Sequence, residues 1–322
     1  MKLFLTSAYD YHPMLDALVR MAKLDKIGRH TLAESAEEAD AILFVENAHF
    51  DDYVYKRLAC HPLLRQFPNK VFMYNEVDKP WCALPGLYCS MPSRFFQSRR
   101  QVAFPYLVTP NRFVPYIHQW DVEKRWLFSF VGSVSHRCRK DVIALANVCE
   151  GVKDTSEFNV WDSSEQERTA QGLDFAEALA GSHFMLCPRG IGTSSYRVFE
   201  AMQAQRAPVV ISDHWVEPPH VDWDFLIRID EKDIRHVPAI LRSMVDEADD
   251  RALAARQAWE RAYAPDVMFD TATESVGHLL EAQRLRQQND PWQNVRKLLI
   301  NSEVRTLEAA RRFKQQWTHA LS

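Results

Sequence analysis

Three charged residues suited to binding a polar ligand, Arg189, Arg197 and Glu200, lie close together in the segment 183–213. The segment consists of an apolar run, a loop with two glycines, an amphipathic stretch and a second apolar run. This pattern predicts a strand at 183–187, a helix at 194–205 and a strand at 207–211, which together form one βαβ unit of a parallel sheet. Ligands of such sheets bind where strands end and helices begin. The polar residues at that point are therefore the site candidates: Arg189, Gly190, Gly192, Thr193, Ser194, Ser195, Arg197 and Glu200.

The chemistry of these candidates points to a nucleoside diphosphate. A helix that begins at Ser194 or Ser195 presents unpaired N–H groups and the positive end of its dipole, which favours an anion. The guanidinium groups of Arg189 and Arg197 match phosphate oxygens. Glu200 follows Arg197 by three positions and shares its helix face. Because a carboxylate repels phosphate, we expect Glu200 to bind ribose hydroxyls. The alternative is an exposed Arg–Glu ion pair, which contributes little.

The order of motifs in this segment resembles that of the exostosin-like glycosyltransferases. The shared residues run PRG, SYRVFEAMQAQRAPVVISDHWVEPP and VDW, and the recognisable part extends over 128–241. The resemblance implies an inverting, metal-independent transferase of the two-domain GT-B fold that uses nucleotide sugars, mostly uridine diphosphate sugars. It assigns Arg189, Arg197 and Glu200 to the donor nucleotide, and we place Gly190, Ser194, Ser195 and Tyr196 in the same donor site. The sugar and the acceptor do not follow from the resemblance.

Length and composition agree with a globular protein of two domains. The chain has 322 residues, of which 47% are hydrophobic and 25% charged, so each half can bury its own core. A formal net charge of -4 gives no reason to expect a nucleic-acid partner. The six cysteines show no CxxC spacing, and we expect neither a metal nor a cofactor. No signal peptide or run of about 18 apolar residues is visible, which predicts a cytoplasmic protein; many exostosin relatives instead carry a membrane anchor.

The strand and helix patterns predict an α/β fold, and the resemblance to GT-B enzymes implies two Rossmann-like domains facing a central cleft, with C-terminal helices packing back across the N-terminal domain. It further implies that the first domain, 1–120, binds the acceptor and that the second, 121–285, binds the donor. In the second domain a strand at 126–131 runs into a Gly132–Ser133 turn and a basic helix. We expect Ser133 with Arg137 or Arg139 to meet the donor phosphates; the alternative for the arginines is a solvated helix end.

Polar residues follow each buried strand of the first domain, and one of them is expected to be the general base. Glu76, after the strand at 70–74, is the first choice, followed by Asp10 and His12, and then by Glu46. An inverting transfer needs such a base to deprotonate the acceptor hydroxyl. With no Asp-x-Asp pair in a suitable place, protein cations are expected to replace a divalent metal.

The last segment, 286–322, has an amphipathic helical pattern with many basic residues. It predicts either a helix that packs on the first domain or a peripheral contact with the inner face of a membrane, where a lipid-linked acceptor would lie.

Three other functions remain open at this point. A catalytically silent homologue would bind a nucleotide sugar or stabilise a partner transferase. A fucosyltransferase-like enzyme would use a guanosine diphosphate sugar. A Rossmann oxidoreductase is disfavoured because no G-x-G-x-x-G follows a predicted strand.

Overall fold

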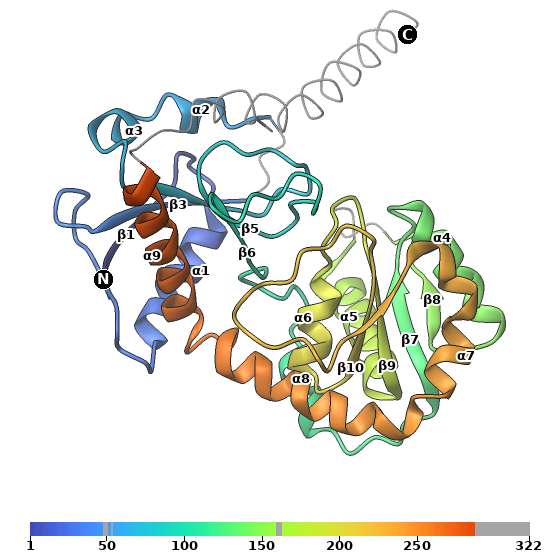
Figure 1. Cartoon of the computed structure of the whole chain (residues 1–322). Helices are drawn as coiled ribbons and strands as arrows, with labels where there is room; N and C mark the ends of the chain where they lie inside the picture. The colour runs from blue at the N-terminus through green and yellow to red at the C-terminus, as the bar shows by residue number, and fades with distance from the viewer. Residues whose placement is uncertain (48–50, 53, 159–162, 287–322) are drawn as a thin grey trace, which may run out of the picture.

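The computed structural model describes residues 1–47, 51–52, 54–158 and 163–286 and contains two parallel sheets (Figure 1). The first sheet has the order β2-β1-β3-β4-β5-β6, and all its neighbouring strands are parallel. Its strands are β1 (Lys2–Thr6), β2 (Thr31–Leu32), β3 (Ala41–Glu46), β4 (Val71–Asn75), β5 (Gly86–Tyr88) and β6 (Gln101–Ala103). The parallel α/β layer predicted for the first domain is confirmed.

Two apolar layers cover the faces of the first sheet because side chains alternate along its strands. Leu43 and Val45 of β3 pack with α1 (Pro13–Leu24) and α9 (Met268–Arg286). Ile42 and Phe44 pack on the other face with residues of α2 (Lys56–Ala59) and, less deeply, α3 (Pro62–Gln66). The segment 56–66 thus forms two short helices, because Pro62 cannot continue the first helix and instead begins the second.

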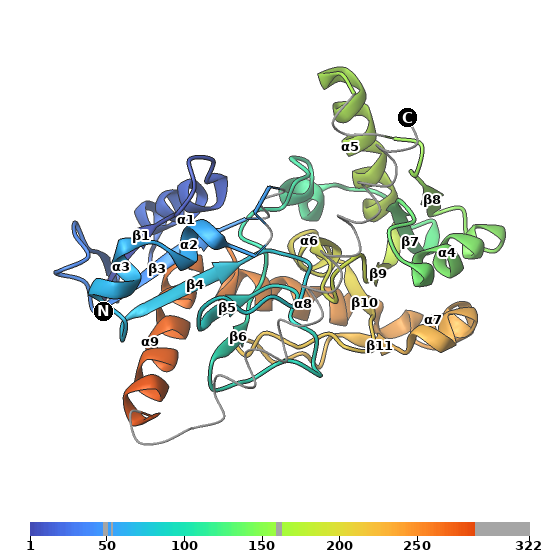
Figure 2. The ribbon, with the colours of Figure 1, turned by 90° about the horizontal axis from the view of Figure 1, so that it is seen from above.

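The second sheet has the order β11-β10-β9-β7-β8 and is also parallel. Its strands are β7 (Trp126–Gly132), β8 (Val152–Asp154), β9 (Ser182–Pro188), β10 (Ala207–Ile211) and β11 (Ile227–Ile229). Figures 1 and 2 show α5, α6 and α8 on one face and α4 and α7 on the other. The helices are α4 (Arg137–Ile143), α5 (Glu165–Ala180), α6 (Tyr196–Gln203), α7 (Val237–Arg242) and α8 (Ala248–Ala262), with short 3₁₀ turns η1 (Val114–Gln119), η2 (Ala144–Asn147), η3 (Glu231–His236) and η4 (Val245–Glu247).

The chain returns to its first domain through α9, which contacts α1, β3, β5 and β6 (Figure 1). The predicted return of the C-terminal helices is therefore present, but it begins at Met268, within the range 121–285 that was predicted to belong to the second domain. The helix expected at 286–322 lies almost wholly outside the described residues. Across the part of the chain that the structure describes, no helix has the length and apolar character needed to span a bilayer.

One apolar cluster joins the two domains. It contains Leu43 and Phe104 of the first domain together with Phe199 on α6 and Trp259 on α8. The two sheets are consequently held against each other by a shared core, and the polar cavity described below lies beside this junction.

Candidate functional site

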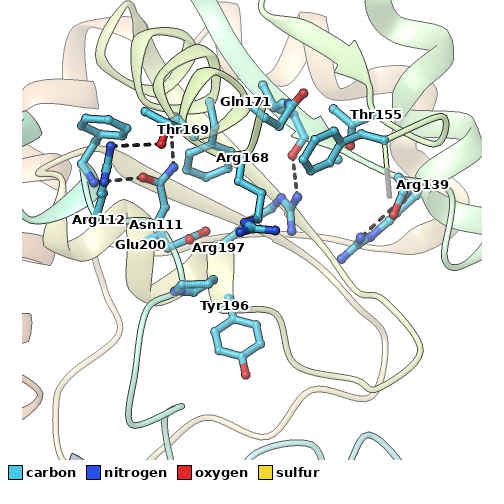
Figure 3. A pocket seen from close by; sticks show the side chains of 18 of the residues that line it. Asn111, Arg112, Arg139, Thr155, Arg168, Thr169, Gln171, Tyr196, Arg197 and Glu200 are labelled. Carbon is cyan, nitrogen blue, oxygen red and sulfur yellow. Dashed lines mark hydrogen bonds between the residues drawn. The ribbon is translucent and has the colours of Figure 1, made fainter. Parts of the chain in front are cut away.

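A cavity of about 990 Å³ opens where the strands of the second sheet end, and residues 78 and 110–113 of the first domain complete its wall. Figure 3 shows Glu200 and Arg139 at opposite ends of this cavity, with Arg197 between them. The volume is in the range of small-molecule sites. The predicted position of the site, at the carboxyl ends of parallel strands, agrees with this geometry.

Helix α6 carries the central residues because its two faces differ in chemistry. Val198, Ala201 and Met202 are buried in the core, while Arg197 and Glu200 line the cavity. The helix begins after Ser195, whose side chain caps it by accepting a hydrogen bond from the backbone N–H of Arg197 at 3.4 Å. The predicted helix is therefore confirmed, although it begins after the serine pair.

The guanidinium of Arg197 is fixed against strand β7 and the aromatic ring of Phe130 on that strand. Its Nη2 donates to the carbonyl oxygen of Val131, and its Cζ lies 5.0 Å from the centroid of the Phe130 ring. A Cβ at Gly132 would lie 2.3 Å from Nη2, so only glycine leaves room for this arrangement. Burial lowers the pKa of Arg197, while Glu200 raises it. The Nε atom is buried and has no hydrogen-bond partner among the described residues.

The carboxylate of Glu200 is 3% exposed and accepts no hydrogen bond from any described residue. Burial raises its pKa to about 7, and the charge of Arg197 opposes this rise. A buried acceptor without a donor is costly unless a ligand supplies one. Glu200 is therefore available to accept hydrogen bonds from a ligand in the cavity.

The basic helix α4 contributes one arginine to the cavity. Arg139 is 8% exposed, and its Nε donates to the carbonyl oxygen of Arg189 at 3.0 Å. Burial, followed by the nearby charge of Arg197, lowers its pKa to about 10. Ser133 also lines the cavity, whereas Arg137 is exposed and outside its wall. Of the two arginines left open by the sequence, Arg139 is the one that the structure brings to the site.

The PRG loop and the serine pair do not line this cavity. Thr193 donates from Oγ1 to the carbonyl oxygen of Ser90 at 3.1 Å, and a Cβ at Gly192 would lie 2.4 Å from Oδ1 of Asp78. Arg189 donates from Nη2 to the carbonyl oxygen of Ile191 at 3.1 Å, and its Nη1 lies 3.9 Å from Oε1 of Glu231.

This packing changes the predicted donor site. The loop is occupied by contacts with the first domain, and Gly190, Ser194 and Ser195 are buried. Tyr196 lines the cavity, but as part of an aromatic stack on Tyr106 with 3.7 Å between ring centroids. The basic and polar groups that line this cavity are thus Arg139, Arg197 and the Gly132–Ser133 turn, while the predicted residues Arg189, Gly190, Ser194 and Ser195 lie outside its wall.

Part of the cavity wall carries no motif and was missed by sequence reasoning. Asn111 donates to the carbonyl oxygen of Gly172 at 2.8 Å, and Arg112 donates to Oγ1 of Thr169 at 3.1 Å. These contacts hold the segment 110–113 against α5 (Figure 3). The wall also contains polar and aromatic residues on and near α5: Thr155, Phe158, Glu165, Arg168, Gln171 and Phe175.

The predicted base candidates of the first domain lie in different surroundings. Glu76 accepts hydrogen bonds from the hydroxyls of Tyr196 and Tyr74, and burial raises its pKa to about 7. The side chain of Asp10 is fully exposed beside Arg57. His12 precedes α1 and lies 3.4 Å from Asp16. Glu46 is fully buried and accepts from Ser7 and from the backbone of Ala8. None of these four is among the residues that line the cavity.

Asp78, two residues after Glu76, does line the cavity and is exposed to it. It was predicted only as one of the polar residues that follow β4. No periodic pattern distinguishes it from Glu76 in the sequence, because both lie in the irregular segment after the strand.

One group of potential metal ligands is present outside the cavity. His136, Cys138 and Glu231 place ligand atoms within 4.8 Å of one another. The sequence was interpreted as lacking such a His–Cys arrangement, but Nδ1 of His136 lies 3.1 Å from Sγ of Cys138. Burial raises the pKa of Cys138 to about 12, so the thiol is protonated at neutral pH.

Two parallel α/β domains with a polar cavity between them form the two-domain arrangement expected of the GT-B fold. The model of the Exostosin GT47 domain family matches residues 86–244, just under half of the chain, so this part of the chain is similar to an exostosin-type glycosyltransferase domain. The resemblance found in the motifs is confirmed.

Named relatives and a solved structure are similar to parts of this chain. The chain is 35% identical over 126 residues to Exostosin-1 of Drosophila melanogaster, covering 37% of the chain and 16% of that protein. It is 31% identical over 131 residues to the Exostosin-1 homolog of Caenorhabditis elegans, covering 37% of the chain and 33% of that protein. The match therefore spans a third or less of these relatives' length. The crystal structure of TarM aligns with a TM-score of 0.37 at 11% identity, covering 82% of this chain and 58% of TarM.

Proposed function

We propose that this chain transfers a sugar from a uridine diphosphate sugar to a hydroxyl of a glycan or lipid-linked glycan, with inversion and without a metal ion. The observation that carries the proposal is the pair Arg197 and Glu200 in the cavity. It combines a buried guanidinium with a free Nε and a buried carboxylate with no donor among the described residues.

In this proposal the donor diphosphate lies against Arg139, Arg197 and Ser133, and its ribose lies against Glu200. Cations fixed where charge develops on the leaving diphosphate stabilise the transition state more than the ground state. Two guanidinium groups supply that charge in place of a divalent cation. The choice of uridine over guanosine is supported by the family resemblance alone.

Nucleotide binding tests the donor site directly. Thermal unfolding of the full chain is measured with UDP and with GDP, each in the presence and absence of a chelator. A ligand at about 100 times its Kd stabilises the folded state by about 2.7 kcal/mol. We expect UDP to raise the melting temperature with or without the chelator. A rise with GDP alone would contradict the uridine assignment, and a rise with neither would contradict the donor site.

The ribose contact is tested by a double-mutant cycle between the protein and the ligand. Titration calorimetry compares UDP with 2′-deoxy-UDP on the wild type and on Glu200→Ala. Hydrogen bonds to charged groups contribute roughly 1.5–3 kcal/mol, so the wild type should lose about tenfold or more in affinity for the deoxy ligand. Glu200→Ala should bind both ligands equally. An equal loss in both proteins would place the ribose elsewhere.

A second candidate, a nucleotide-sugar-binding subunit without catalysis, is favoured by one observation. The predicted base Glu76 has its carboxylate oxygens engaged by two tyrosine hydroxyls and does not line the cavity. Release of UDP from UDP-sugars by the purified chain distinguishes the two functions, because a silent subunit binds the donor without consuming it.

A further inference from the structure

Asp78 is the carboxylate that the first domain contributes to the described wall of the donor cavity. Glu165 and Glu200 are the other carboxylates in the described part of the cavity wall, and both belong to the second domain. Asp78 follows β4 and reaches the second domain, since its Oδ1 would be 2.4 Å from a Cβ at Gly192. It thus lies at the domain junction, on the acceptor side of the cavity.

Local contacts hold the Asp78 carboxylate without occupying it fully. Oδ1 accepts a long hydrogen bond of 3.4 Å from Oγ of Ser90, and Ser90 is itself only 2% exposed. No other hydrogen bond to this carboxylate involves a described residue. At least one oxygen is therefore free to accept a proton from a molecule in the cavity.

The charges around Asp78 suit a group that takes up a proton. Burial between the domains raises its pKa, although the side chain is open to the cavity, and the cations Lys79, Arg139 and Arg189 oppose the rise. Arg139 also lines the cavity where the diphosphate is proposed to bind. The same space therefore contains a carboxylate for the acceptor hydroxyl and a cation for the leaving group.

Glu76 has a different function in this arrangement. The hydroxyl of Tyr196 donates to its Oε1 and that of Tyr74 donates to its Oε2. Tyr196 in turn stacks on Tyr106 and forms part of the cavity wall. Glu76 consequently positions Tyr196, and it is not among the residues that line the cavity where the acceptor would bind.

We propose that Asp78 is the general base of the transfer and that Glu76 is a positioning residue; this inference depends on the proposed function. The acceptor oxygen bonds to the anomeric carbon of the donor sugar while its proton moves to a carboxylate oxygen of Asp78. The bond from that carbon to the diphosphate oxygen breaks, and its electron pair leaves with the diphosphate. Attack from the face opposite the leaving group inverts the anomeric centre.

The first experiment measures UDP release from a panel of UDP-sugars, with water as the acceptor. General base catalysis contributes about 10²–10⁴-fold. We expect Asp78→Asn to release UDP at least about 100-fold more slowly than the wild type, with a Kd for UDP within about twofold. Asp141→Asn, at an exposed acid of α4 outside the cavity, is the matched control and should retain the wild-type rate.

The second experiment separates a base from a positioning residue. Azide is already an anion and needs no deprotonation, so it can replace the acceptor when the base is missing. Asp78→Ala with sodium azide should form a glycosyl azide of inverted configuration and recover a large part of the lost rate. Glu76→Gln should slow turnover without any recovery by azide, because its defect lies in the position of Tyr196.

The outcomes distinguish this inference from the proposed function. A wild-type chain that neither binds UDP nor consumes any UDP-sugar overturns both. An active wild type with an equally active Asp78→Asn variant overturns the base alone. Azide rescue of Glu76 variants, but not of Asp78→Ala, would assign the base to Glu76 instead.

Discussion

Two Arg–Glu combinations in the second domain contain the same chemical groups but differ in their surroundings. Arg197 and Glu200 lie on one face of α6 and line the cavity. Arg189 and Glu231 lie outside its wall, with 3.9 Å between their nearest charged atoms. Glu231 has a described hydrogen-bond donor in the backbone N–H of Asp213 at 3.5 Å, whereas Glu200 has none among the described residues.

The difference shows that residue type and motif membership do not by themselves make a binding group. Three residues of the motif, Arg189, Arg197 and Glu200, were predicted to bind the donor. The structure opens only two of them to the cavity, because the loop that holds Arg189 turns toward Glu231 and packs on the first domain.

The largest expected effect is the loss of donor affinity on Arg197→Ala. Removing a charged hydrogen-bonding group costs roughly 1.5–3 kcal/mol, or about 10- to 150-fold in Kd for UDP measured by calorimetry. Arg197→Lys should restore little, because a single ammonium cannot reproduce the guanidinium fork. If Arg197→Ala bound UDP as tightly as the wild type, the Arg197–Glu200 combination would not differ from the Arg189–Glu231 combination in donor binding.

Gly132→Ala should produce a smaller loss by an indirect route. The new Cβ would lie 2.3 Å from Nη2 of Arg197 and displace the guanidinium. We expect roughly tenfold weaker UDP binding, from part of one charged hydrogen bond. Gly172→Ala is the matched control, because Gly172 lines the same cavity and its Cβ would have ordinary contacts from 3.6 Å. Equal effects of both substitutions would show that Arg197 tolerates the displacement.

Glu200→Gln should change the pH dependence of stability. The pKa of Glu200 is about 7 in the folded chain against 4.5 as its ordinary value, so the folded state binds its proton more tightly. The unfolding free energy of the wild type should fall as pH rises from about 4.5 to 7. Denaturant unfolding should show a shallower fall for Glu200→Gln, by on the order of 1–3 kcal/mol over this window.

Glu76 has a raised pKa in the same range, which sharpens the test. The contribution of Glu76 to the pH dependence of the unfolding free energy persists in Glu200→Gln. Both contributions should be absent from a double variant that replaces Glu76 and Glu200 with glutamine. Parallel pH profiles for the wild type and Glu200→Gln would contradict the buried, unpaired state of Glu200.

The smallest effect is expected for Arg189→Ala and Arg137→Ala. Arg137 is exposed, and Arg189 faces Glu231 outside the cavity. Both variants should bind UDP within about threefold of the wild type, in accordance with the small contribution of ion pairs near the surface. A loss of UDP affinity comparable to that of Arg197→Ala would show that the PRG loop is part of the donor site.

The sequence alone determined the elements of the fold and the family. The apolar runs at β3, β4, β9 and β10 predict buried parallel strands, because only a sheet covered on both faces buries every side chain of a strand. The spacing on α6 placed Arg197 and Glu200 on one face, since helical periodicity is a local property.

Only the tertiary structure decided which polar residues share the cavity. Arg139 rather than Arg137 enters it because the buried face of α4 is chosen by packing on the second sheet. Asp78 and the segment 110–113 reach it from the first domain, through contacts between residues far apart in the chain. Such proximity depends on how the two domains pack against each other, and no local pattern of residues records that packing.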